Sequence, residues 1–143
     1  MTKEISGLRF LRSMAALSDY AEKLVLDWLV TEGSATRPTA WYVALYTSPP
    51  SDSGGGTEVS GFNYSRQAVT FAEATTPGGT TSNTNTVNFT ASGGSFGTIT
   101  HLGVFDAVSS GNLLWHGALT ASKLINDGDT LQFAINDIDL TFA

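Results

Sequence analysis

The stretch Trp41-Tyr-Val-Ala-Leu-Tyr-Thr47 decides the fold class of this 143-residue chain. It is an unbroken run of apolar, aromatic and β-branched residues, which is typical of a β-strand buried on both faces. Shorter runs follow it between turn signals, and we predict further strands at residues 65–71, 86–90, 98–105, 113–119, 131–135 and 138–142. Because strands and helices do not alternate, these segments predict a mainly β protein, an antiparallel β-sandwich or jelly roll with one N-terminal amphipathic helix.

The connections between the predicted strands carry recognisable turn residues. Residues 48–57 (SPPSDSGGGT) are too rich in Pro, Gly and Ser for regular structure and predict a long loop. Asn126-Asp-Gly-Asp129 predicts a turn in which the glycine takes a positive φ. The apolar positions of segments 131–135 and 138–142 are out of phase, so a bulge or tight turn is expected at residues 136–137.

The N-terminal part has a helical pattern instead. Leu17, Ala21, Leu24, Val25 and Trp28 fall at i, i+4, i+7, i+8 and i+11 and predict an amphipathic helix over residues 18–32. Ser18 is the expected N-cap, and Gly33 is the expected stop. We expect residues 1–17 to form an arm that docks on a neighbouring subunit, and residues 18–143 to form a single globular domain with its sandwich at 40–143.

Composition and charge exclude several function classes. The formal net charge is −6, and residues 38–143 contain two bases, Arg66 and Lys123, against eight acids. Such a region cannot neutralise a row of phosphates, so we expect no nucleic-acid partner. The absence of cysteine excludes disulfides, thiolate zinc sites and cysteine nucleophiles. We also expect no signal peptide and no membrane insertion, because apolar runs of the required length are missing.

Three patterns that can indicate catalysis or metal binding have simpler interpretations here. Gly93-Gly-Ser-Phe-Gly97 matches the hydrolase string G-x-S-x-G, but a Thr-rich strand follows it, so a glycine-rich connection is expected. His101 and His116 are expected to pack structurally, with a two-histidine metal site as the open alternative. The acids within residues 127–129 and 137–139 are expected to be solvated turn residues. We therefore predict no catalytic residue, no cofactor and no metal ion.

Aromatic residues cluster in sequence near the long loop, at Trp41, Tyr42, Tyr46, Phe62 and Tyr64. Exposed, they would form a sugar-binding or protein-binding surface, and buried, they are ordinary core. The apolar run around Trp41 favours burial of that residue. Both alternatives stay open for Phe62 and Tyr64.

A set of ordered segments carries a family resemblance. The segments are Leu17-Ser-Asp-Tyr-Ala-Glu-Lys-Leu-Val-Leu-Asp-Trp-Leu29, Trp41-Tyr-Val-Ala-Leu-Tyr-Thr-Ser-Pro49, Gly55-Gly-Thr-Glu-Val-Ser-Gly61, Tyr64-Ser-Arg-Gln-Ala-Val-Thr-Phe71, Phe96-Gly-Thr-Ile-Thr-His-Leu-Gly-Val-Phe-Asp106, Gly111-Asn-Leu-Leu-Trp-His-Gly-Ala-Leu119 and Gly128-Asp-Thr-Leu131. Together they resemble the small structural proteins of tailed bacteriophages often labelled tail fibre protein, some relatives of which are capsid decoration or cement proteins. The resemblance covers about residues 15–143.

The resemblance implies a non-enzymatic structural protein of a phage virion, made in the host cytoplasm. We expect first a homo-oligomeric decoration or cement protein that binds and stabilises the capsid surface through many weak contacts. The alternative is a tail-fibre or tail-tip component that contributes to binding of host receptor glycans. A small glycan hydrolase is the enzymatic alternative, and the sequence has no motif for it.

The expected partners are further copies of the chain and a phage coat or tail protein. We predict two interface regions. The residues are Leu8, Phe10, Leu11 and Arg12 in the arm, and Glu58 and Phe62 in the loop at 48–62. Arg66 is added as a position that resembles the family. It could form a structural pair with Glu58 or with another acid, so no specific partner is predicted for it.

Overall fold

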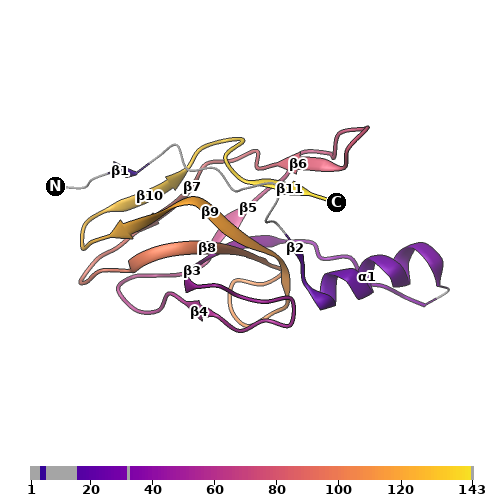
Figure 1. Cartoon of the computed structure of the whole chain (residues 1–143), viewed down its shortest axis with the longest axis horizontal. Coiled ribbons are helices and arrows are strands. Elements are labelled where there is room, and N and C mark those ends of the chain that lie inside the picture. The colour runs from indigo at the N-terminus through magenta and orange to yellow at the C-terminus, as the bar shows by residue number, and fades with distance from the viewer. Residues whose placement is uncertain (1–3, 6–15, 32, 143) are drawn as a thin grey trace.

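Figure 1 shows the computed structural model of the chain, which describes residues 4–5, 16–31 and 33–142. The elements are β1 (Glu4–Ile5), β2 (Ala16–Leu17), α1 (Asp19–Val30), β3 (Trp41–Ser48), β4 (Thr57–Glu58), β5 (Gln67–Val69), β6 (Thr80–Ser82), β7 (Val87–Thr90), β8 (Gly97–Phe105), β9 (Leu113–Ile125), β10 (Thr130–Phe133) and β11 (Asp139–Thr141). The protein is mainly β, with antiparallel sheets and a helix near the N-terminus, as the sequence pattern predicts.

The larger sheet has the strand order β2-β9-β8-β3-β4, and β5 pairs with β3 beside β4. Its centre is formed by β3, β8 and β9, and β3 pairs with β8 from Tyr42↔Phe105 to Tyr46↔His101. Residues 43–46 of β3 are all buried, which confirms the prediction of a strand covered on both faces. The two faces of this strand therefore contact different parts of the molecule.

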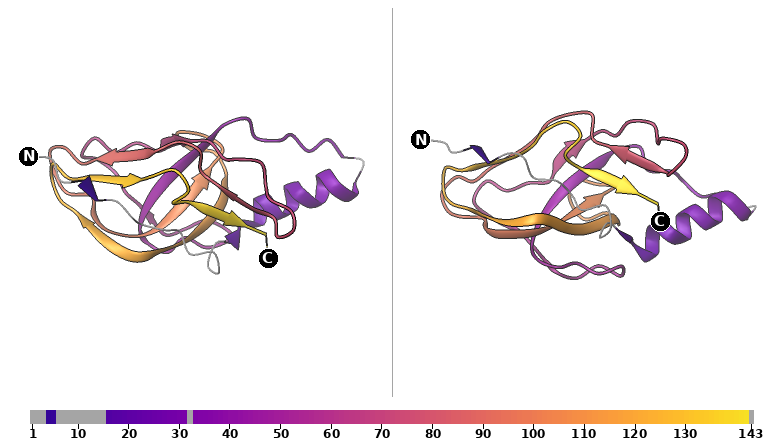
Figure 2. Two further views of the ribbon diagram at one scale, coloured as in Figure 1. Left: turned by 90° about the horizontal axis from the view of Figure 1, so that it is seen from above. Right: turned by 45° about the horizontal axis from the view of Figure 1, so that its top comes forward.

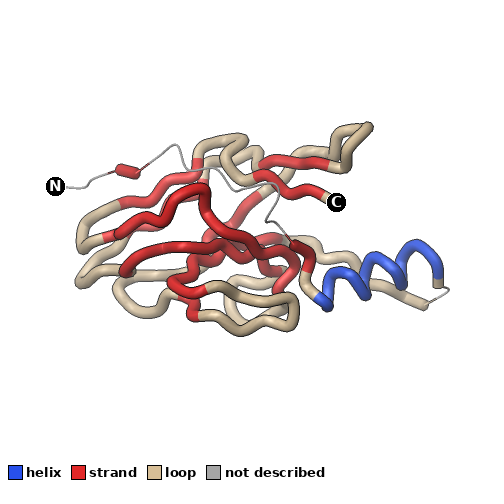
Figure 3. The backbone as a smooth tube through the Cα atoms, viewed as in Figure 1, coloured by secondary structure: helices blue, strands red, loops and turns tan. Residues whose placement is uncertain are grey.

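The second layer consists of a sheet β1-β10-β7 and a two-stranded sheet β11-β6 (Figures 1 and 3). Its pairs are antiparallel except for β1 with β10, which are parallel. Apolar side chains from both layers form one core. This core includes Val43, Leu45, Leu102 and Val104 of the larger sheet and Phe89, Leu131, Phe133 and Leu140 of the second layer.

Several predicted strand limits are wrong. Segment 113–119 continues to Ile125, because β9 keeps pairing with β8 as far as Gly97↔Ile125. Segment 65–71 is a strand only at 67–69, and segment 138–142 only at 139–141. Residue 57 lies in β4 rather than in a loop, because Thr57 pairs with Ser48. The polar strand β6 is not expected from its sequence and forms by pairing with β11.

Helix α1 begins as predicted and ends earlier. Ser18 is the N-cap, and its hydroxyl accepts a hydrogen bond of 3.1 Å from the Ala21 amide. The helix ends at Val30, with Thr31 as C-cap donating its hydroxyl to the Asp27 carbonyl at 2.8 Å. The expected stop at Gly33 is therefore wrong, because a side-chain hydroxyl already caps the last turn. This helix is too short to cross a membrane, and the described part of the chain holds no helix that could.

Helix α1 stands out from the body of strands (Figures 1 and 2). Its first turn lies against the larger sheet, and its later turns extend beyond it. The chain then returns alongside the helix to enter β3 (Figure 2). The helix thus has a docked end and a projecting end.

Candidate functional site

The site is a pocket on the outer face of the larger sheet, the face opposite the core. A second apolar cluster lies there, formed by Ala44, Tyr46, Phe105 and Leu113. It exists because β3 alternates, so that Val43 and Leu45 face the core while Ala44 and Tyr46 face outward.

Small residues make room for the aromatic rings of this cluster. A Cβ atom at Gly103 would lie 3.0 Å from both Leu113 and Tyr46 and 3.1 Å from Phe105. Gly103 is paired with Ala44 in the neighbouring strand, so two small residues lie side by side beneath the rings. The rings can therefore pack directly on the backbone of the sheet and form the floor of the pocket.

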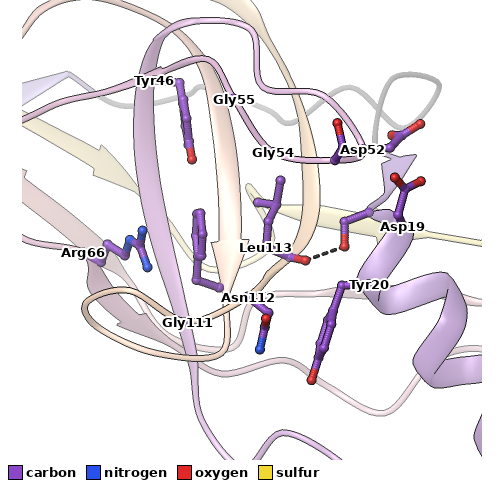
Figure 4. Close-up of a pocket in the computed structure, with 13 residues that line it drawn as sticks. Asp19, Tyr20, Tyr46, Asp52, Gly54, Gly55, Arg66, Gly111, Asn112 and Leu113 are labelled. Carbon is purple, nitrogen blue, oxygen red and sulfur yellow. Dashed lines mark hydrogen bonds between the residues drawn. The ribbon is translucent and has the colours of Figure 1, made fainter.

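The pocket has a volume of about 600 Å³ and opens to solvent between three chain segments (Figure 4). Its walls are the first turn of α1, the loop at residues 52–55, and residues 111–113. Tyr20, Asp19 and Asp52 lie at one side of the opening, and Arg66 lies at the other. Its size is within the range of small-molecule sites, about 300–1,000 Å³.

Hydrogen bonds fix the walls to the sheet. The Ser18 hydroxyl donates to the Leu113 carbonyl, as the dashed line in Figure 4 marks. The Ser18 amide donates to the Leu114 carbonyl, and the Asp19 amide donates to the Asp52 carbonyl, each at 3.0 Å. Ser18 is itself fully buried, so it both caps the helix and attaches the helix to β9.

Arg66 forms the opposite wall and has a partner for each of its guanidinium nitrogens. Its Nε and Nη2 donate to the two carboxylate oxygens of Glu58, each at 2.8 Å. Its Nη1 donates to the carbonyls of Ala107 and Ser110, at 3.1 and 2.6 Å. The guanidinium carbon lies 3.5 Å from the centre of the Phe105 ring, a cation–π contact. Arg66 therefore links the loop at 106–112 to β4.

Two tyrosines complete this network. The Tyr64 hydroxyl donates to Glu58 at 2.9 Å and accepts from the Leu45 amide at 3.0 Å. Burial raises the pKa of Tyr64, and the Leu45 hydrogen bond opposes the rise only in part. Burial, and next the Glu58 charge, raise the pKa of Tyr46 to about 12. Burial lowers the pKa of Arg66, but the hydrogen bonds that Arg66 donates to Glu58 and the Glu58 charge outweigh burial and raise it. Arg66 and both tyrosines thus keep their protons at neutral pH.

The aromatic residues that cluster in sequence near the long loop lie in different parts of the structure. Tyr46 is in the pocket floor, and Trp41 and Tyr64 pack against the core. Tyr64 stacks on Phe89, with ring centroids 6.0 Å apart. Of the two alternatives left open for Tyr64, the structure therefore supports the buried one. Phe62 is exposed, and its ring covers Gly94, where a Cβ would lie 2.3 Å from it.

The described residues among the predicted interface positions do not lie together either. Glu58 and Arg66 are paired with each other, the structural partnership considered from the sequence. Phe62 does not line the pocket and lies against the turn before β8. The arm positions Leu8, Phe10, Leu11 and Arg12 lie outside the described residues.

The residues considered for catalysis have structural contacts. His116 donates its Nε2–H to Asp52 at 2.8 Å, and His101 is hydrogen-bonded to Thr100 at 2.8 Å. Burial lowers the pKa of His101, and the nearby His116 lowers it further. The described residues contain no group of three His, Cys, Asp or Glu side chains placed to hold a metal ion.

The serine of the G-x-S-x-G string has a local role. The Ser95 hydroxyl donates to the Ile125 carbonyl at 2.6 Å and accepts from the Gly97 amide at 2.9 Å. Strand β8 begins at Gly97, as expected for a connection between strands. The acids of the 126–129 turn also accept backbone amides, Asp127 from Gly93 and Asp129 from Asn126.

Tyr20, Asp52 and Asn112 are neighbours in the pocket, and the sequence pattern does not predict this. They lie on three separate segments, and contacts between strands β3, β8 and β9 bring these together. The Pro-, Gly- and Ser-rich loop around Asp52 was the one available signal, because such loops often carry binding residues.

Most of the chain matches a known protein family. The family described as Podophage GP4 fiber I protein gp80 matches residues 16–141. This range includes every strand of the larger sheet and the whole pocket. None of the curated proteins matches the chain.

Proposed function

Because the chain belongs to the Gp80 family of podophage fiber I proteins, we propose that it is a tail-fibre component of a tailed-phage virion that contributes to host receptor binding. The match over residues 16–141 is the observation that carries this proposal. It agrees with the resemblance to phage tail fibre proteins seen in the sequence motifs. The role is structural and non-enzymatic, and the fibre description supports it.

The pocket supports the receptor-binding part of the proposal. Tyr20 offers a partly exposed aromatic ring, and the exposed Asp52 side chain lies at the same opening. A ring beside hydrogen-bonding groups suits a ligand that has both apolar faces and hydroxyls, as saccharides do. The Arg66 network keeps the opposite wall fixed, so the pocket is formed before a ligand arrives.

Capsid decoration, the first expectation from the sequence, is the second candidate. The described body is a compact stack of strands with one projecting helix and has no elongated shaft (Figure 2). That shape suits a module attached to a particle surface in many copies. The description of the family as a fibre protein supports the tail location instead.

Copy number on purified particles tests the proposal. Quantitative mass spectrometry against the major coat protein gives copies per particle, and antibody-gold labelling in electron micrographs gives the location. A few to a few dozen copies with label at the tail are expected for a fibre component. Hundreds of copies with label over the head would overturn the fibre proposal in favour of decoration.

Receptor binding needs a separate assay, because location alone does not demonstrate it. We expect the purified chain to compete with phage for adsorption to host cells, and Tyr20→Ser to weaken this competition. Ile135→Ser is the matched control, since Ile135 is also an exposed apolar residue and does not line the pocket. Equal competition by both variants would show that the pocket does not contact the receptor.

A further inference from the structure

A second cleft, the β5–β7 cleft, lies where β5 of the larger sheet meets β7, the outer strand of the sheet β1-β10-β7. It has a volume of about 240 Å³, and its lining comes from residues 63–65, Gln67, residues 88–90 and Phe96. None of these residues lines the pocket beside α1. The cleft is therefore a separate feature, and the proposed receptor pocket does not account for it.

The lining of the β5–β7 cleft is polar but carries no charged side chain. Tyr64 packs on Phe89 and Phe96, and both phenylalanines are buried. The remaining lining residues are uncharged and polar: Asn63, Ser65, Gln67, Asn88 and Thr90. A charged ligand would lose hydration here without meeting a counter-charge, so the lining favours a neutral polar ligand.

Two of the three carboxamides in this cleft are anchored at one end. The Gln67 Nε2 donates to the Ser65 carbonyl at 2.9 Å and to the Ser65 hydroxyl at 3.1 Å, and the Asn88 Oδ1 accepts from Gln132 at 3.0 Å. Within the described part of the chain, Gln67 Oε1, Asn88 Nδ2 and the whole Asn63 carboxamide have no hydrogen-bond partner. The cleft thus offers an acceptor, a donor and a group that does both, which matches the needs of hydroxyl groups.

The turn that carries Asn63 has a strained backbone. Phe62 and Asn63 have φ angles of 52° and 67°, and they are the one pair of consecutive non-glycine residues in the described chain with positive φ. Asparagine tolerates this conformation, but a bulky residue such as phenylalanine rarely adopts it. The Tyr64 amide donates to the Gly61 carbonyl at 2.8 Å, and the Ser92 amide donates to the Phe62 carbonyl at 3.0 Å. Strain that the surroundings impose in this way is typical of ligand sites.

The strained turn presents the Phe62 ring beside the cleft. The ring is 47% exposed and rests on Gly94, where a Cβ atom would lie only 2.3 Å from it. Gly94 is two residues before Phe96 of the cleft lining, and Phe62 is next to Asn63. A flat apolar face thus adjoins the free carboxamides.

This combination suits a ligand with an apolar face and several hydroxyls, as a sugar ring has. The cleft is smaller than sites for drug-sized ligands, about 300–1,000 Å³, so it suits a single ring. We propose that the β5–β7 cleft and Phe62 form a second binding site, which takes one ring of a neutral saccharide.

An NMR titration of the full chain with simple sugars tests this proposal. The probes are glucose, galactose, mannose and N-acetylglucosamine, and the signals to follow are the side-chain NH₂ resonances of Asn63, Gln67 and Asn88. At least one of these sugars is expected to shift the three signals with a millimolar dissociation constant. Glucuronate is expected to shift them less at equal concentration, because its carboxylate meets no counter-charge.

Asn63→Gly removes a carboxamide and keeps the left-handed backbone, which glycine adopts readily. It is expected to raise the dissociation constant about fivefold or more, since the hydrogen bonds of Asn63 to the sugar are lost. Asn136→Gly is the matched control, because Asn136 has a φ of 68° and does not line the cleft. Asn88→Ala is a second cleft variant with the same expected direction as Asn63→Gly. Tyr20→Ser is expected to leave these shifts unchanged, because Tyr20 lines the other pocket.

Four results would overturn the proposal, once circular dichroism has established that each variant is folded. The first is a lack of shifts at Asn63, Gln67 and Asn88 with every neutral sugar, and the second is equal weakening by Asn63→Gly and Asn136→Gly. The third is an effect of glucuronate as large as that of the neutral sugars. Shifts with triglycine but with none of the sugars would indicate a peptide site instead. The adsorption assay with Tyr20→Ser is independent of all four, so failure here is distinguishable from failure of the receptor proposal.

Discussion

Replacing Glu58 by alanine is expected to destabilise the fold strongly, although the residue lies beside a solvent-open pocket. The change removes three hydrogen-bond acceptor contacts, two from Arg66 at 2.8 Å and one from Tyr64 at 2.9 Å. It leaves the Arg66 side chain, which is 9% exposed, without its counter-charge. Breaking a fully buried ion pair costs about 3–5 kcal/mol, because the remaining charge is desolvated and unpaired.

The expected loss of unfolding free energy is smaller than this cost for a fully buried ion pair. Glu58 is 26% exposed, so water can enter its place and partly solvate the guanidinium. Two carbonyls, of Ala107 and Ser110, also keep their bonds to Arg66 in the variant. We therefore expect Glu58→Ala to lower the free energy of unfolding by about 2–4 kcal/mol. For a domain of this size, that corresponds to a fall in Tm of roughly 5–15 °C.

A double-mutant cycle with urea unfolding separates the ion pair from its surroundings. The free energies of unfolding of Glu58→Ala, Arg66→Ala and the double variant are expected to give a coupling energy of about 1–3 kcal/mol. Asp27→Ala is the control, because it breaks the ion pair with Lys23 at the helix surface and is expected to cost no more than about 0.5 kcal/mol. A loss for Glu58→Ala no larger than for Asp27→Ala, or a coupling energy near zero, would refute the reasoning.

Two further predictions concern the walls and floor of the site, and a third concerns His101 in β8. Ser18→Ala removes both the helix cap and the bond to the Leu113 carbonyl, and is expected to lower the free energy of unfolding by about 1–2 kcal/mol in the same urea assay. Gly103→Ala places a methyl group 3.0 Å from Tyr46 and is expected to cost about 1–3 kcal/mol through overpacking, measured as a lower Tm. Stability is expected to fall as the pH is lowered below 6.5, because the folded protein binds the His101 proton less readily than the unfolded chain does. His101→Gln should reduce this fall in pH-dependent unfolding.

The sequence was most informative about β3, and the reason is local. Residues 41–47 are apolar at consecutive positions, a pattern that a strand with one solvent-exposed face does not produce. In the structure, both faces of β3 are covered by apolar clusters. Val43 and Leu45 pack in the core, and Ala44 and Tyr46 lie in the pocket floor. Turn residues were informative because their backbone preference is also local. Gly128, for example, adopts the predicted positive φ, at 87°.

The strands that were missed lack such local signals. Residues Thr80–Ser82 have no alternation of apolar and polar side chains, and they form β6 because β11 pairs with them. The end of β9, from Thr120 to Ile125, is mostly exposed and is likewise held by pairing with β8. Pairing between distant segments is the physical cause in both cases, and single-sequence periodicity does not contain it.

The helix shows a different limit of sequence reasoning. The spacing of Ala21, Leu24, Val25 and Trp28 correctly predicts an amphipathic helix. Periodicity gives the position of an apolar face but does not say what covers it. The cover depends on the angle at which α1 leaves the sheet, which is fixed by the bonds of Ser18 to Leu113 and Leu114. These residues are 95 and 96 positions away, beyond any helical pattern.

The Arg66 network lies within the segments that carry the family resemblance, whereas part of the pocket opening lies outside them. Glu58, Tyr64, Arg66 and Phe105 all lie in the segments that carry the resemblance, and they hold the loops of the site in place. Those motifs therefore describe a scaffold. Residues 50–54, which include Asp52 at the pocket opening, lie outside every one of these segments. Residues 50–54 make none of the hydrogen bonds of the Arg66 network, so a substitution in this loop leaves that network intact.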